Sequence, residues 1–507
     1  MNDTYVLGAG SIIVLASYMA AMILIGWIAK HRTKGDSTLD YFLGGKVTGG
    51  LVLFFTMQAT QLSGNTFFGF TGIAYRTGLM WIVSICMISL IVVTQLSYIP
   101  RLYVLSKLNG YITPADFYAD RYQSNRLRLL VTGVTIVAML PYLIIQAEAT
   151  GHAFSGLTSG QIPYWAGVAF TCTVMLIYIL MGGWRGVVWT DTVQGVLLTS
   201  ALVIVTVVVV LTVGGIPSIV EELRTDNVAL IQAPESLKQL SRSWLSLLVI
   251  SSIGFAMYPQ AIQRVYAAKS ESALKTSLSL MLVVPYLIGG CTLLLGLSAA
   301  ISHPGLIGVD SDRVFSLLLN DLISNHYWLV IFVLCGLLAA IMSTASSVIL
   351  TLASMFTRDI YQTIWRRNTR DEGNTIAGRV FIVILIVTVA ALSLRPSATL
   401  WRLTEIKVEL LAQLFPAMIL GLYWPRISEW PAVIGIVVGC LFVAVSALLG
   451  VERFWWFQSG VYALVLNLTI AVVSSMIFNP STTLQEQMRK RFFGPFQTSV
   501  DTGYRQR

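Results

Sequence analysis

Charged residues are scarce in this sequence of 507 residues, since Asp, Glu, Lys and Arg make up only 11% of it, while hydrophobic residues make up 56%. An ordinary soluble domain is about 25% charged. Stretches such as 203–213 are apolar throughout and lack the polar face of an amphipathic helix. Apolar runs of about 20 residues, long enough to cross a bilayer as a helix, recur from end to end. The composition excludes a soluble fold and predicts an all-α polytopic membrane protein.

Cysteine and histidine are also scarce, with five and four residues. The cysteines lie inside predicted helices without paired spacing, which argues against a disulfide frame or a metal site. The histidines are far apart in the sequence, so no zinc pattern and no nucleophile with an adjacent base is evident. Without a convergent set of acid, base or metal ligands, we do not expect an enzyme.

Hydropathy predicts about thirteen membrane-spanning helices. Their expected centres are near residues 18, 60, 90, 140, 173, 202, 253, 287, 340, 385, 412, 438 and 467. The first apolar run follows Asp3 rather than a basic region, so we expect an uncleaved span instead of a signal peptide.

The net charge of +9 is distributed over alternate loops. Basic residues gather at 30–46, 101–128, 264–275, 358–379 and 489–491. The positive-inside rule makes these loops cytoplasmic, with the N-terminus outside and the C-terminus inside, a result that needs an odd number of spans. We interpret each basic group as a topology anchor rather than as a patch for nucleic acid.

The stretch Ala339 to Ser347 places four hydroxyl groups inside one apolar span. Ser343, Ser346 and Ser347 share one helix face, because they stand at positions i, i+3 and i+4. Such oxygen atoms suit hard cations, and polar groups at membrane depth usually face the protein interior. Small residues also permit close helix packing, which is the alternative explanation.

A second unusual span covers Gln58 to Gly72, where glycines and polar side chains interrupt the apolar pattern. The stretch Ser251 to Arg264 is interrupted in a similar way. A broken membrane helix frees backbone carbonyl groups, which is tolerated where they line a cavity. Two broken spans in corresponding halves are typical of a transporter binding site.

These features, taken with several short motifs, resemble the sodium:solute symporter family. The motifs are Tyr41 to Gly45, Ala59 to Gly72, Gly182-Gly183 with Trp189 to Gln194, Gln263-Arg264 with Ala267 to Lys269, and Ala339 to Thr344. The resemblance implies a leucine-transporter-like fold with about 13 transmembrane helices and two inverted five-helix repeats. The implied division is an N-terminal helix and loop at 1–44, the first repeat at 45–215, an extracellular loop at 216–239, the second repeat at 240–425, two further helices at 426–480, and a cytoplasmic tail at 481–507.

The resemblance also implies ligands for Na⁺. The shared sodium site of the family corresponds to the backbone carbonyls of Ala59, Leu62 and Ala340 and to the hydroxyls of Ser343 and Thr344. A second sodium site, present in some members, corresponds to Asp191, Ser343, Ser346 and Ser347. A carboxylate inside a span favours a functional role, although Asp191 is also suited to cap a helix start.

In the family the solute lies beside the broken helix. The candidate contacts in this chain are Gln61, Ser63 and Thr66, with Gln146, Phe255 and Tyr258 facing them. Packing or structural hydrogen bonding is the alternative role for each. Members of the proline branch carry Asp at the position of Gln61, and sugar transporters carry another polar residue at the position of Tyr258, so proline and sugars fit less well.

Three charged residues, Glu405, Lys407 and Glu409, enter a late span. The two glutamates share a helix face and need a partner to offset their repulsion. Lys407 points elsewhere, and we expect it to pair with Glu148, since charges within membranes commonly pair. The alternative is that Lys407 receives the carboxylate of an organic anion.

The sequence thus predicts a sodium-coupled symporter that imports an organic acid, an amino acid or a pantothenate-like solute by alternating access. We expect it in the plasma membrane, the inner membrane of a bacterium, with Na⁺ (one ion or two), the solute and the lipid bilayer as partners. Neither nucleic acid nor an obligate protein partner is expected. Two alternatives remain open: proton coupling through Glu148 or Asp191, and a nutrient sensor of the same fold without net flux.

Overall fold

The computed structural model describes residues 9–32, 38–157, 162–225, 228–232, 237–365, 371–394, 400–477 and 486–494. The elements of the first half are α1 (Ala9–His31), α2 (Thr38–Leu43), η1 (Gly44–Lys46), α3 (Gly50–Gln61), α4 (Gly64–Phe67), α5 (Gly69–Thr77), η2 (Gly78–Trp81), α6 (Ile82–Asn109), α7 (Pro114–Tyr122), α8 (Asn125–Leu157), α9 (Tyr164–Thr212), α10 (Gly215–Thr225) and η3 (Val228–Leu230). Those of the second half are α11 (Leu237–Ala256), α12 (Pro259–Ala267), α13 (Glu271–Met281), α14 (Val284–Ser302), η4 (Gly308–Arg313), α15 (Val314–Met355), the π-helix η5 (Phe356–Trp365), α16 (Asp371–Ser393), α17 (Leu400–Ala412), α18 (Phe415–Tyr423), α19 (Glu429–Leu448), β1 (Arg453–Phe454), β2 (Phe457–Gln458) and α20 (Ser459–Ile477).

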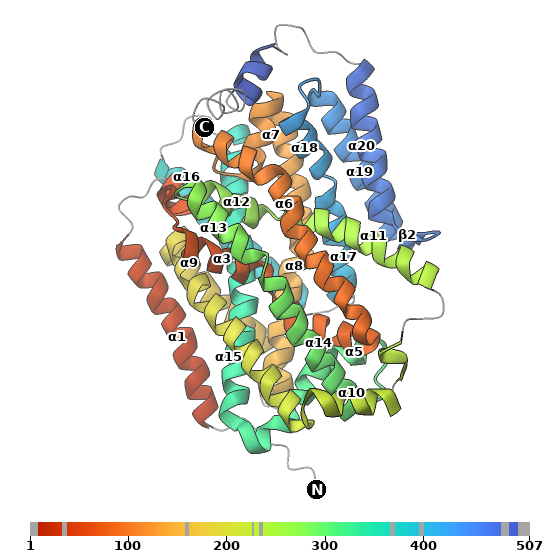
Figure 1. Cartoon of the computed structure of the whole chain (residues 1–507). Coiled ribbons are helices and arrows are strands. Elements are labelled where there is room, and N and C mark those ends of the chain that lie inside the picture. Colours follow the sequence, from red (N-terminus) through yellow and green to blue (C-terminus); the bar gives the residue numbers. More distant parts are fainter. Residues whose placement is uncertain are drawn as a thin grey trace, which may run out of the picture.

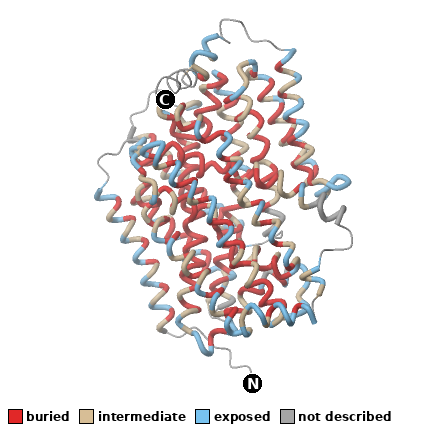
Figure 2. Tube along the Cα trace, viewed as in Figure 1, coloured by how far each residue is buried: buried red, intermediate tan, exposed pale blue. Residues whose placement is uncertain are grey.

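Helix α15 lies at the centre of the bundle and is buried along most of its length (Figures 1 and 2). The peripheral helices α1, α19 and α20 instead expose large apolar side chains, such as Ile13, Leu441 and Val465. Exposed apolar area of this extent would be anomalous on a soluble monomer. On a bundle of membrane-length helices it is the surface that meets lipid.

Ten segments of the described residues are long and apolar enough to cross a membrane, or eleven when the bent pair α11 and α12 is counted as one span. The sequence predicts thirteen spans, and the difference arises because two of these segments each contain two neighbouring expected spans. The segment 64–109 joins the expected span near 90 to the second part of the one near 60, and α9 contains the centres at 173 and 202.

Helix α9 reverses direction at Gly183, whose φ is 50°. A Cβ placed on Gly186 would lie 3.5 Å from the carbonyl oxygen of Tyr178, whereas eight residues of a straight helix rise about 12 Å. The turn has no room for a side chain, because a Cβ on Gly183 would stand 2.9 Å from the carbonyl oxygen of Tyr41. The two parts of α9 therefore make two crossings.

Both predicted helix breaks are present. Helix α3 ends at Gln61, Leu62 and Ser63 are extended, and α4 begins at Gly64. The second break lies at Tyr258, where Pro259 starts α12 and the chain bends by 45°. Proline explains this break, since it lacks an N–H group and disfavours helical geometry in the residue before it.

Helix α1 begins and α20 ends at opposite ends of the molecule (Figure 1), as an odd number of crossings requires. Parts of two expected basic loops, 33–37 and 366–370, lie outside the described residues, as does most of the tail. One assignment within the basic groups is wrong. Arg264 is wholly buried and ion-paired, so it is not a topology anchor.

Candidate functional site

Backbone and side-chain oxygen atoms meet where the break after α3 touches α15. The Ser343 hydroxyl donates to the carbonyl oxygens of Ala59 at 2.8 Å and Ala340 at 3.2 Å. The Thr344 hydroxyl donates to the carbonyl oxygen of Leu62 at 3.0 Å and lies 3.4 Å from that of Ala59. The structure thus brings together the five positions that the sequence suggested, and we call them the oxygen cluster.

Local backbone geometry creates this cluster. The break at Leu62 and Ser63 leaves carbonyl groups at the end of α3 without helical partners. Gly64 lets the broken helix approach α15, since a Cβ on it would stand 2.9 Å from the Ile341 side chain. The cluster is buried and contains neutral oxygen atoms only. Neutral oxygen ligands and unwound carbonyl groups suit Na⁺.

The described residues contain no group of three or more His, Cys, Asp or Glu side chains that could hold a metal ion. A transition-metal site of that kind is therefore absent from the part of the chain that is described. The oxygen cluster differs from such a site because its atoms are neutral carbonyl and hydroxyl oxygens. Oxygen atoms of this kind can bind monovalent cations without charged ligands.

Asp191 on α9 forms a buried ion pair with Arg264 on α12, with 2.7 Å between Oδ2 and the guanidinium. The same oxygen accepts hydrogen bonds from Thr56 at 2.6 Å and from Ser347 at 3.0 Å. Arg264 also donates to Ser347 at 2.6 Å. The other carboxylate oxygen, Oδ1, is buried and has no hydrogen-bond partner among the described residues.

The four residues expected at a second sodium site therefore lie close together, but a guanidinium already neutralises the carboxylate. Ser346 donates to the carbonyl oxygen of Ser343 at 3.3 Å rather than to Asp191. Asp191 does not cap a helix start, because it lies within the second part of α9. Sequence reasoning missed the role of Arg264 by counting it among loop cations.

The six expected solute contacts separate into two groups. Thr66 accepts a hydrogen bond from the Ser63 backbone at 3.2 Å, and Gln146 accepts one from the Gly64 backbone at 3.3 Å. These bonds occupy N–H groups that the break leaves free, so Ser63, Thr66 and Gln146 support the break itself. Gln61, Phe255 and Tyr258 instead line a cavity beside it.

The remaining cavity walls are apolar, and they come from α5, α6, α13 and α14 as well as from the break. Their residues are Leu62, Phe70, Met87, Ile88, Ile91, Val92, Met281, Val284 and Pro285. The cavity has a volume of about 50 Å³. No acidic or basic side chain is among the described residues that line it.

Lys407 on α17 is fully buried and lies against the rings of Phe255 and Tyr258, two residues of the cavity wall. Its ammonium donates to the Tyr258 hydroxyl at 2.5 Å and lies 3.4 Å from the centre of the Tyr142 ring. None of its contacts is with Glu148, so the expected ion pair between these two residues is wrong. Glu405 and Glu409 accept hydrogen bonds from Gln458 and Ser459.

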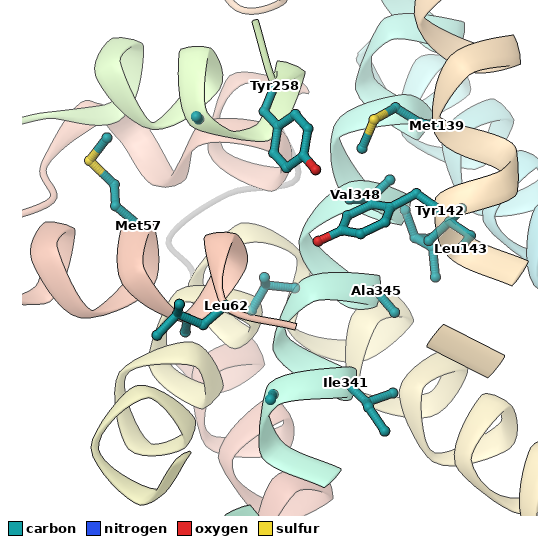
Figure 3. Close-up of a cluster of buried hydrophobic side chains, with 14 of the residues drawn as sticks. Met57, Leu62, Met139, Tyr142, Leu143, Tyr258, Ile341, Ala345 and Val348 are labelled. Carbon is teal, nitrogen blue, oxygen red and sulfur yellow. The ribbon is translucent and has the colours of Figure 1, made fainter. Parts of the chain in front are cut away.

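Tyr142 on α8 is a second residue that sequence reasoning missed. Its hydroxyl lies close to those of Ser63, Tyr258 and Thr344. Tyr142 and Tyr258 lie next to each other near Leu62 (Figure 3), with ring centroids 5.6 Å apart and ring planes tilted by 47°. The available signal was spacing, because Tyr142 stands one helical turn before Gln146 on the same face.

A helical bundle with two broken membrane spans around an oxygen cluster defines a secondary transporter with the leucine-transporter-like fold. A solved structure of a Na⁺-coupled sialic acid symporter superposes with a TM-score of 0.78 and 20% sequence identity, covering 93% of this chain and 99% of the other. Residues 41–439 match the model of the sodium:solute symporter family, and the chain belongs to this family.

The sequence is similar to those of curated relatives over nearly its full length. The osmoregulated proline transporter OpuE of Bacillus subtilis is 29% identical, covering 95% of this chain and 97% of its own. The sodium/pantothenate symporter of Escherichia coli is 28% identical, covering 92% of this chain and 96% of its own. These relatives are multi-pass membrane transporters, not enzymes.

Proposed function

We propose that this protein is a sodium-coupled symporter that imports a small organic solute by alternating access. The observation that carries the proposal is the oxygen cluster, in which hydroxyls of α15 meet carbonyl groups at the end of α3. In this proposal Ala59, Leu62, Ala340, Ser343 and Thr344 bind one Na⁺. The membership of the sodium:solute symporter family supports it.

The ion would act as a bridge between the broken helix and α15. Ser343 and Thr344 now donate their protons to the carbonyl groups, and on binding Na⁺ they would turn their oxygen lone pairs toward it. The bridge fixes the break in one shape. Separation of α3 from α15 would remove ligands from both sides of the ion and release it.

A second Na⁺ is proposed at Asp191 with Ser343, Ser346 and Ser347. The unpartnered oxygen Oδ1 of Asp191 supports this site. Because Arg264 now holds the carboxylate at 2.7 Å, the second ion and the guanidinium would compete. Movement of α12 would therefore be needed before the second ion binds well.

Ser343→Ala tests the sodium site. We expect sodium to bind at least about tenfold more weakly, equivalent to about 1.4 kcal/mol, because one oxygen ligand is lost. The measurement is the thermal unfolding midpoint of the purified protein at increasing NaCl, with choline chloride keeping ionic strength constant, since a ligand of the native state raises the midpoint by mass action.

Ser298→Ala is the matched control, since Ser298 is equally buried and its hydroxyl has no hydrogen-bond partner. It should keep the full sodium response. If the wild-type protein responds neither to NaCl nor to a sodium gradient in vesicles, but transports solute when a pH gradient is applied, the proposal of sodium coupling is wrong and proton coupling takes its place. If sodium and solute bind without flux into vesicles, the protein is a sensor rather than a symporter.

A further inference from the structure

We propose that the cavity beside the broken helix takes a small monocarboxylate without an amino group, bound by Gln61 and Tyr258, with the charge supplied by Lys407. This inference rests on the proposed function and deepens it by naming the substrate class. It assigns to Lys407 the role of a positioned cation that lacks a counter-ion among the described residues.

Lys407 is a buried cation without a carboxylate partner among the described residues. Its side chain is fully buried, and the Tyr258 hydroxyl is its one hydrogen-bond acceptor. Three aromatic rings surround the ammonium, with centroids 3.4 Å (Tyr142), 5.1 Å (Phe255) and 4.9 Å (Tyr258) away.

The aromatic rings offset the burial cost of the ammonium, but they give its N–H groups no oxygen acceptor. Each cation–π contact contributes about 0.5–2 kcal/mol, and taking an ammonium out of water costs several kcal/mol. An ammonium also has three N–H donors, and one of them is used. The site therefore favours the arrival of an anion.

The polar groups of the cavity are suited to a carboxylate. The Nε2 group of Gln61 is buried and has no hydrogen-bond partner in the described part of the chain, and Gln61 belongs to the cavity wall. The Tyr258 hydroxyl accepts from Lys407 and lies close to the Tyr142 hydroxyl, so on binding a solute it would turn its proton from Tyr142 toward the solute. Two donors backed by one positive charge match the two oxygens of a carboxylate.

The same walls disfavour the other expected solutes. An amino acid carries an ammonium, for which the lining residues offer no carboxylate, and Lys407 would repel it. A sugar would leave most of its hydroxyls facing Met87, Ile88, Ile91 and Val92. The volume of about 50 Å³ is far below the about 300–1,000 Å³ of sites for drug-sized ligands, which favours a short aliphatic chain.

The test compares acids with uncharged and zwitterionic analogues in the purified wild type. Propionate and lactate are each added in saturating NaCl, beside propionamide, lactamide, alanine, proline and glucose. We expect the unfolding midpoint to rise by several degrees with at least one acid and not with its amide, nor with the amino acids or glucose. The response to the acid should require NaCl.

Lys407→Met should abolish the response to the acid while keeping the response to NaCl. Without solute, this variant should unfold at a higher temperature than the wild type, because a buried charge that has no counter-ion among the described residues is removed and the volume is nearly kept. A purely structural lysine would give the opposite shift. Lys107→Met is the matched control, since Lys107 also contacts an aromatic ring, that of Tyr103, but lies outside the cavity.

The outcomes separate the two proposals. A wild type that responds to NaCl but not to either acid, or that responds equally to an acid and its amide, overturns the assignment to Lys407 and leaves sodium coupling standing. Retention of the acid response in Lys407→Met overturns it as well. Loss of the sodium response in the wild type would instead overturn the proposed function.

Discussion

Arg264→Met is expected to destabilise the folded protein by about 3–5 kcal/mol, the usual cost of leaving one partner of a buried ion pair alone. The side chains of Arg264 and Asp191 are 1% and 0% exposed. Without the guanidinium, only the Thr56 and Ser347 hydroxyls remain to stabilise the carboxylate. The measurement is the thermal unfolding midpoint in choline chloride, compared with that of the wild type.

Two controls make this result specific. The double variant Asp191→Asn with Arg264→Met should recover much of the loss, because the buried charge disappears with its partner. Lys275→Met removes an exposed ion pair with Glu271, in which the side chains are 75% and 59% exposed, and should change stability by no more than about 1 kcal/mol. An Arg264→Met protein as stable as the wild type would contradict the interpretation of this pair.

The single variant Arg264→Met also tests the proposed second sodium site. If Na⁺ binds at Asp191 when the guanidinium is absent, NaCl should raise the midpoint of Arg264→Met more steeply than that of the wild type. An equal dependence on NaCl in the two proteins would argue that the carboxylate serves the ion pair only.

Gly254→Ala is expected to cost up to about 3 kcal/mol, the upper part of the range for overpacked interiors. Gly254 lies where α11 crosses α17, and an added Cβ would stand 2.3 Å from the carbonyl oxygen of Val408. A backbone atom cannot rotate away, so the two helices would have to separate. The unfolding midpoint of the purified protein measures the loss.

This substitution should also disturb the solute site, since Val408 is the neighbour of Lys407 in sequence. Gly290→Ala is the matched control on another membrane helix, because nothing lies within 4 Å of an added Cβ there. It should be neutral or slightly stabilising, given the higher helix propensity of alanine. If the two substitutions changed the unfolding midpoint equally, the close contact between Gly254 and α17 would not be the cause of the loss of stability.

The helix breaks were predictable because their causes are local. Glycines and polar residues between Gln58 and Gly72 interrupt one span, and Pro259 interrupts the other. The oxygen cluster could not be predicted from local sequence alone, since it joins Ser343 to a carbonyl 284 positions earlier in the sequence. Only the resemblance to a family connected those distant stretches.

The pairing of charges was not predictable, because the sequence records which residues are charged but not where their partners lie. Arg264 stands near other cations in the sequence, yet its guanidinium binds a carboxylate 73 positions away. Lys407 was expected to pair with Glu148, but aromatic rings surround it instead. The resemblance to the family suggests Thr66 and Gln146 as solute contacts, whereas in the structure their side-chain oxygens accept hydrogen bonds from N–H groups of the broken helix.

The Tyr142 hydroxyl lies close to those of Thr344, in the oxygen cluster, and Tyr258, which accepts a hydrogen bond from Lys407. One phenol ring is thus shared by the two proposed binding places. A shift of this ring caused by one ligand changes the surroundings of the other, and the resulting change in affinity must be equal in both directions. A single side chain, rather than a large interface, would in this way couple the binding of the ion to the binding of the solute.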